Sequence, residues 1–91
     1  MIKNITIEVD IDTDPEYIKL AQIAFDTVLA TMLEGEKTHP EQDWQTANHI
    51  DRIMQHAYKY HNGDTAEDHI GHALTRCAMV KAIQVIYASR F

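Results

Sequence analysis

Residues 61–76 read HNGDTAEDHIGHALTR, and this stretch decides the fold expected for the chain. Asn62-Gly63 is a strong helix stop, because glycine adopts the left-handed backbone of helix C-termini at little cost. Asp64 or Thr65 can then cap the next helix. Two helices joined by so short a turn are expected to lie side by side and antiparallel.

Basic side chains line one face of each of these predicted helices. The upstream helix carries His49, Arg52, His56 and Lys59 at positions i, i+3, i+7 and i+10, and the downstream helix carries His69, His72 and Arg76 at i, i+3 and i+7. Such spacings share one helical face. A hairpin turning near residues 62–63 would place His56 near His69, Arg52 or Ile53 near His72, and His49 near Arg76. The two polar faces are therefore expected to meet in a seam.

The bulk composition describes one globular domain, residues 1–91, with 45% hydrophobic residues and a net charge of -6. That charge argues against binding of long nucleic acid, which needs a broad basic surface, but leaves room for a small nucleotide in a local basic pocket. The chain has no apolar run long enough to span a membrane and no signal-peptide pattern. Cys77 is the single cysteine, so no intrachain disulfide can form. A cytoplasmic location is expected.

The predicted fold class is mainly α: a three-helix domain with one N-terminal strand that pairs between subunits. The helices are expected at about 14–34, 42–60 and 65–88, and the strand at 4–12, where Ile5, Ile7, Val9 and Ile11 alternate with polar residues. A lone strand must pair with a second copy, with a partner's sheet, or lie along the helices. Self-pairing in a homo-oligomer is favoured, because helix 14–34 is apolar over much of its circumference. The core stripe expected for helix 42–60 is Ala47, Ile50, Met54 and Ala57.

Three interpretations of the seam follow from its residue types. In the first it captures an anion: Arg52 and Arg76 donate to phosphate oxygens, the histidines donate as well, and Trp44, Tyr58 or Tyr60 stacks on a base. In the second it binds a metal ion. His69 with His72 (i, i+3) and Asp68 with His72 (i, i+4) have chelating spacings, and His56, Glu67 or Asp51 can complete a site for zinc, manganese or iron in preference to magnesium. In the third it is a structural polar layer in which Arg76 pairs with Asp51.

Several of these residues also resemble a known family. Trp44, HID at 49–51, HA at 56–57, GD at 63–64 and EDHIGHALTR at 67–76, with Met79, resemble the N-terminal domain of dATP/dGTP diphosphohydrolase, found in small phage and bacterial proteins. The similarity covers roughly residues 39–83. It implies a helical phage-type protein, in the cytoplasm of a bacterial host, that handles purine nucleotides through a bound divalent metal. The functional positions that it implies are His56, Glu67, Asp68, His69, His72 and Arg76.

The expected function is binding of a small phosphorylated purine, linear or cyclic. The expected ligand-binding residues are Trp44, His49, Arg52, His56, Tyr60, His69, His72 and Arg76, and the expected ligands of a divalent metal (Zn, Mn or Mg) are Glu67, Asp68, His69 and His72. Helical nucleotide pyrophosphohydrolases hold magnesium on a ladder of carboxylates at ExxE-like spacing, which the pairs Glu34/Glu36 and Glu67/Asp68 do not form. This favours a sequestering, sponge-like binder that counters a host defence. Metal-dependent pyrophosphohydrolysis and an adaptor acting by strand addition are the alternatives.

Overall fold

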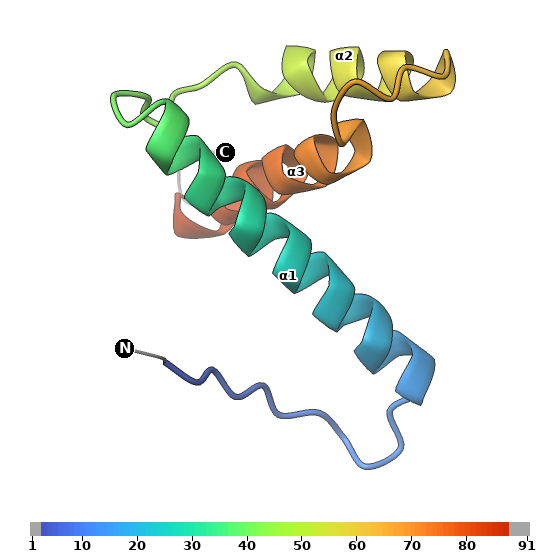
Figure 1. Cartoon of the computed structure of the whole chain (residues 1–91). Helices are drawn as coiled ribbons and strands as arrows, with labels where there is room; N and C mark the ends of the chain where they lie inside the picture. Colours follow the sequence, from blue (N-terminus) through green and yellow to red (C-terminus); the bar gives the residue numbers. More distant parts are fainter. Residues whose placement is uncertain (1–2, 88–91) are drawn as a thin grey trace.

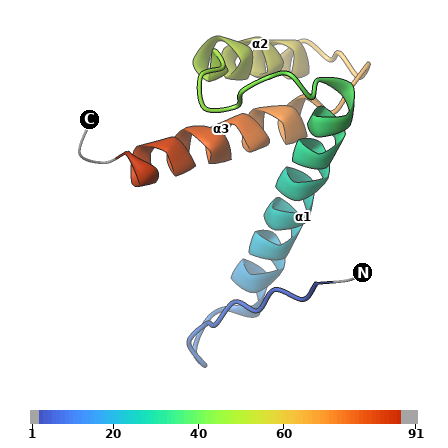
Figure 2. The same ribbon diagram turned by 90° about the vertical axis from the view of Figure 1, so that its left-hand side faces the viewer.

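The computed structural model describes residues 3–87 and is mainly helical, as predicted. Its helices are α1 (Pro15–Thr38), α2 (His49–His61) and α3 (His69–Ile86). Helix α3 is central: α2 packs on it as an antiparallel neighbour, and α1 crosses it (Figure 1). The N-terminal half of α1 extends away from the other two helices (Figure 2). The predicted strand 4–12 does not form within the described residues: residues 3–10 have no regular secondary structure, and a turn follows in which the Thr13 N–H donates to the Asp10 carbonyl at 3.0 Å.

The turn after α2 is a Schellman motif, which explains why Asn62-Gly63 stops the helix. The Asp64 N–H donates to the Lys59 carbonyl and the Gly63 N–H donates to the Tyr60 carbonyl, both at 3.0 Å. These two bonds satisfy carbonyls that the helix end leaves free. The motif requires a left-handed residue, and Gly63 supplies it with φ of 82°.

Helix α3 begins at His69, later than the predicted residue 65, because Asp64 closes a separate turn and Asp68 is the residue that caps the helix. The Asp64 carboxylate accepts from the Ala66 N–H at 2.8 Å, which holds residues 64–66 in a tight turn. The Asp68 carboxylate then accepts from the Gly71 N–H at 2.9 Å and caps α3. Residues 64–68 are consequently a structured connector. The last residue predicted for this helix, residue 88, lies outside the described residues.

The other two helices also differ from their predicted bounds for local reasons. Asp14 caps α1 by accepting from the Glu16 N–H, with Pro15 in the first turn, and the helix runs past Gly35 to Thr38. Gly35 does not stop it, because this glycine keeps a helical backbone. Helix α2 begins at His49, since residues 42–48 form turns in which Asp43 accepts from the Gln45 N–H.

Helices α1 and α3 approach closely through small residues. A Cβ atom built on Gly71 would lie 3.1 Å from Cγ2 of Thr27 on α1 and would overlap the carboxylate of Asp68. Thr75, one turn further along α3, is almost completely buried and donates its hydroxyl to the Gly71 carbonyl at 2.8 Å. Tyr17, Leu20, Ile23, Phe25, Leu29, Met32 and Leu33 are all exposed.

The α2–α3 hairpin is polar inside and apolar outside. The buried polar side chains of the described chain are His49, His69 and Thr75, and no hydrophobic side chain between residues 3 and 87 is buried. The predicted core stripe of helix 42–60 is wrong in this chain: Ile50 is 58% exposed and Met54 is 65% exposed. The histidine face of α2 points at α3 in its place. No helix within the described residues combines the length and the apolar character needed to cross a bilayer.

Candidate functional site

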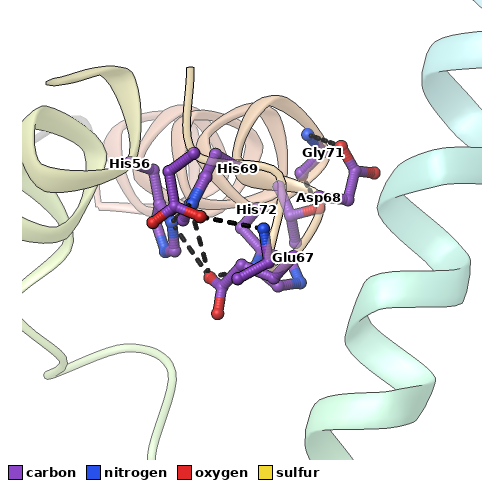
Figure 3. A network of polar contacts seen from close by, with 9 residues as sticks. His56, Glu67, Asp68, His69, Gly71 and His72 are labelled. Carbon is purple, nitrogen blue, oxygen red and sulfur yellow. Dashed lines mark hydrogen bonds and ion pairs between the residues drawn. The ribbon is translucent and has the colours of Figure 1, made fainter. Parts of the chain in front are cut away.

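Three imidazoles and one carboxylate converge where the connector joins α2 to α3 (Figure 3). His56 comes from α2, Glu67 from the connector, and His69 and His72 from the first turn of α3. We call these four residues the imidazole–carboxylate cluster. Nδ1 of His56 lies 2.9 Å from Nδ1 of His69, and the rings of His56 and His72 have their centroids 5.2 Å apart. The predicted pairing of His56 with His69 is therefore confirmed.

Glu67 lies at the centre of this cluster. One oxygen, Oε1, is 3.0 Å from Nδ1 of His72, 3.3 Å from that of His56 and 3.5 Å from that of His69. The hydrogen bond from His72 lowers the pKa of Glu67, and the charges of the surrounding imidazoles act in the same direction against partial desolvation. The Glu67 carboxylate is therefore ionised and faces three nitrogen atoms.

The pKa of His56 is lowered as well, which favours the neutral form of this imidazole. Desolvation lowers the pKa of His56, Glu67 partly offsets that effect, and the neighbouring histidines and Arg76 lower it further. A neutral imidazole keeps one nitrogen lone pair, which is the form that binds metal ions. The local electrostatics therefore favour the metal-binding form of His56.

A second carboxylate, that of Asp64, lies close to His69. Residue His69 is 3% exposed, and its buried Nε2 atom makes no hydrogen bond within the described residues, although Oδ2 of Asp64 lies 3.5 Å away. The hydrogen bond from the Ala66 N–H lowers the pKa of Asp64 against partial desolvation, so this carboxylate is an acceptor. A proton on Nε2 leaves the Nδ1 lone pair of His69 facing the cluster.

The atoms of His56, Glu67 and His72 are close enough for one metal ion, since their ligand atoms lie within 4.8 Å of one another. Asp68, which the sequence predicted as a ligand, does not join them. Its carboxylate turns away to cap α3 through the Gly71 N–H (Figure 3). The reason is its position: a residue directly before a helix is drawn to the free N–H groups of the first turn.

A second basic group, the arginine pair Arg52 and Arg76, lies further along the seam. Among residues 3–87 every ion pair involves a cluster histidine, and neither arginine is paired with a carboxylate. Burial lowers the pKa of Arg76, and the like charge of Arg52 lowers it further. Two guanidinium groups that repel each other without a counter-ion form a site where an anion is stabilised.

His49 hydrogen-bonds to Arg76 and so orients its guanidinium group. Its Nε2 lies against the Trp44 carbonyl, which can only accept, so this nitrogen carries the proton. Its Nδ1 then accepts from Nη1 of Arg76 at 3.2 Å. The predicted contact between His49 and Arg76 is confirmed. Asp51, the alternative partner for Arg76, accepts instead from the Asn48 amide at 2.8 Å.

A pocket of about 290 Å³ opens beside the arginine pair. It is lined by Gln42, Asp43, Thr46, Ala47, Asn48, Arg52 and Arg76. The wall that faces the arginines is thus the turn-rich loop 42–48, which the sequence had predicted as the start of a helix. The polar backbone and side chains of this loop add hydrogen-bonding groups to the two positive charges.

The aromatic residues expected to stack on a base do not line this pocket. Trp44 is part-buried in the 42–48 loop but does not line the cavity. Tyr58 and Tyr60 are exposed on α2, at 71% and 60%. Asp64 is the participant that sequence reasoning missed as a site residue, because the Asn62–Asp64 turn signal accounted for it as a cap. Its position five residues before His69, across a short connector, was the feature of the sequence that could have predicted a contact between the two side chains.

Comparison with known proteins adds no relative, because no family model, no curated protein and no solved structure matches this chain.

Proposed function

We propose that this chain binds a small phosphorylated purine ligand, with its phosphate groups held by Arg52 and Arg76. The observation that carries the proposal is the arginine pair itself: two neighbouring guanidinium groups, one of them partly desolvated, with no carboxylate partner among residues 3–87. Guanidinium groups bind phosphate oxygens through paired N–H donors. His49 fixes the orientation of one of them before any ligand arrives.

The size of the pocket divides the ligand into two parts. Cavities for complete small molecules measure roughly 300–1,000 Å³, so a pocket of about 290 Å³ accommodates the phosphate end of a nucleotide. The base would lie outside it, on Trp44 or on the surface of another copy. The resemblance to purine-handling phage proteins supports a purine, and a cyclic or linear form fits the same phosphate contacts.

Sequestration is favoured over catalysis, because the described residues near the arginine pair include no ladder of carboxylates for magnesium. The imidazole–carboxylate cluster supports one alternative, metal-dependent pyrophosphohydrolysis, since a metal ion at His56, Glu67 and His72 would act as a Lewis acid on a neighbouring phosphate. The two functions differ in the fate of the ligand.

Chromatography of the ligand before and after heat release tests both functions. The protein is incubated with dATP, dGTP or a cyclic dinucleotide, washed, and denatured by heat. Sequestration predicts that intact ligand is recovered in proportion to protein, and that the double variant Arg52→Gln/Arg76→Gln releases none. Hydrolysis predicts free products, and absence of any retained or converted nucleotide contradicts the proposal. Lys59→Gln, which removes a charge from the same helix outside the pocket, is the matched control.

We propose further that the chain works as a homo-oligomer, because its surface is too large for a folded monomer. The accessible surface is 7964 Å², whereas a folded monomer of 10.5 kDa exposes about 5,400 Å². The radius of gyration, 15.2 Å, likewise exceeds the roughly 12 Å expected for this length. The excess surface is about three times the ~800 Å² that each partner contributes to a standard interface.

We place the second copy against the exposed apolar residues. They cover much of the circumference of α1, the outer face of α2, and the alternating Ile5, Ile7, Val9 and Ile11 of the extended N-terminal segment. Pairing of residues 4–12 between copies would satisfy their backbone groups and shield their apolar side. Sedimentation velocity is expected to give a dimer or larger species. A monomer that stays folded at micromolar concentration would contradict this proposal, and a strand that instead adds to another protein's sheet is the adaptor alternative.

A further inference from the structure

We infer that His56, Glu67, His69 and His72 form a binding site for one zinc ion, with Asp64 positioning His69. The inference concerns the imidazole–carboxylate cluster alone and does not depend on the nucleotide ligand proposed above. It extends the triad His56, Glu67 and His72 by a fourth ligand and assigns an ion to the site. It also gives a reason for a helical hairpin whose interior is polar.

The ligand atoms of His56, Glu67 and His72 lie within 4.8 Å of one another, and Nδ1 of His69 lies beside those of His56 and Glu67. Zinc–nitrogen bonds of about 2.0–2.1 Å place tetrahedral ligands about 3.3 Å from one another. The measured separations are 2.9 Å (His56–His69), 3.0 Å (His72–Glu67), 3.3 Å (His56–Glu67) and 3.5 Å (His69–Glu67). Four of the six edges of such a tetrahedron therefore lie within about 0.4 Å of the expected length.

The protonation pattern presents lone pairs to a common point. The Asp64 carboxylate lies 3.5 Å from Nε2 of His69, and a proton on that nitrogen would leave Nδ1 free to coordinate. A carboxylate behind a coordinating histidine is the usual arrangement at zinc sites, where it fixes the tautomer and the ring orientation. The 2.9 Å contact between Nδ1 of His56 and Nδ1 of His69 requires one of these two nitrogens to donate to the other, and His72 makes the hydrogen bond to Oε1 of Glu67.

The donor set selects zinc over magnesium or calcium. Three imidazole nitrogens and one carboxylate oxygen suit zinc and its transition-metal neighbours, whereas magnesium and calcium prefer oxygen ligands. The ligands come from α2, the connector and α3, so one ion would tie the three segments together. Because the unfolded chain lacks this geometry, metal binding adds directly to the free energy of unfolding.

The cluster is also reachable from solvent. The side chain of His72 is 37% exposed and that of Glu67 is 45% exposed, while the His69 side chain behind them is 2% exposed. An ion could therefore enter from the His72 side and rest on His69.

The test uses the untagged full chain, treated with a chelator and then titrated with Zn²⁺ or Co²⁺, with Mg²⁺ as the comparison ion and no nucleotide present. We expect one zinc per chain, a rise in melting temperature with zinc but not with magnesium, and the intense visible bands of tetrahedral cobalt. If the chain binds no zinc, or if the cobalt bands are of octahedral type, the inference is overturned. The four residues would then be a hydrogen-bonded polar layer.

Variants locate the ion. His72→Gln and Glu67→Gln are expected to abolish stoichiometric zinc retention, and Asp64→Asn to weaken it about 10–100-fold, the usual effect of removing a carboxylate behind a ligand. His39→Gln and His61→Gln, exposed histidines outside the cluster, are the matched controls and should retain zinc. Equal loss in a control, or full retention in both ligand variants, would contradict the site. Circular dichroism of each variant shows whether its helices persist, and the wild-type cobalt spectrum tests the site without any substitution.

Discussion

Replacing Gly71 by alanine is expected to offset part or all of the gain of up to about 1 kcal/mol that alanine normally brings over glycine in a helix interior. A Cβ at this position would overlap the Asp68 carboxylate and would lie 3.1 Å from Thr27 Cγ2. The Asp68 side chain must therefore leave the Gly71 N–H, and loss of such a cap costs about 0.5–2 kcal/mol. Moving Thr27 also loosens the contact of α1 with α3.

Gly35→Ala is the matched control, because Gly35 is also helical but a Cβ added there would meet no atom within 4 Å. We expect Gly35→Ala to raise the free energy of unfolding by up to about 1 kcal/mol. The free energy of unfolding of Gly71→Ala should be about 0.5–2 kcal/mol lower than that of Gly35→Ala through loss of the cap alone. This difference corresponds to several degrees in melting temperature. Urea denaturation at one fixed protein concentration measures both. Equal stabilisation by the two alanines would refute the Asp68 cap and the close approach of α1.

Three further perturbations test the electrostatics and the surface. Arg52→Gln should stabilise the ligand-free protein by up to about 1 kcal/mol at low salt, because it removes repulsion from Arg76, and the gain should shrink as salt screens the pair; unchanged urea midpoints at low salt would argue against that repulsion. In metal-free protein the free energy of unfolding should fall as pH drops below 6.5, because burial lowers the pKa of His56 and the unfolded chain then binds the proton more readily. The variant His56→Gln should flatten this pH profile. A profile as steep as that of the wild type would count against the assignment. Leu20→Glu should reduce the sedimenting mass, because Leu20 is exposed apolar surface on α1, whereas the neighbouring Gln22→Glu, with the same charge change, should not; identical masses would remove α1 from the interface.

The sequence predicted the hairpin and its seam because both depend on local chemistry. Asn62-Gly63 encodes a Schellman turn, and the periods of His49, His56 and His69 on two antiparallel helices determine which residues meet. Charge and periodicity along one helix are visible in the sequence. The pairings His56–His69 and His49–Arg76 follow from them once the turn is known.

Other features depended on competition between contacts, which a single sequence does not reveal. Ile50 and Met54 have the periodicity of a core stripe, yet α2 turns its histidine face to α3 and leaves them exposed. Asp68 has the spacing of a metal ligand to His72, but its carboxylate accepts a hydrogen bond from the Gly71 N–H instead. Helix beginnings shifted by several residues because side chains of Asp43 and Asp64 hold local turns.

The most direct test of the proposed function is equilibrium binding of dATP to the wild type and to Arg76→Gln, measured by calorimetry at two salt concentrations. A hydrogen-bonded guanidinium–phosphate contact is worth about 1.5–3 kcal/mol, so the variant should bind about 10–100-fold more weakly. Binding of the wild type should also weaken as salt increases. Equal affinity of the two proteins, or no heat of binding with dATP, dGTP and a cyclic dinucleotide alike, would contradict phosphate capture by the arginine pair.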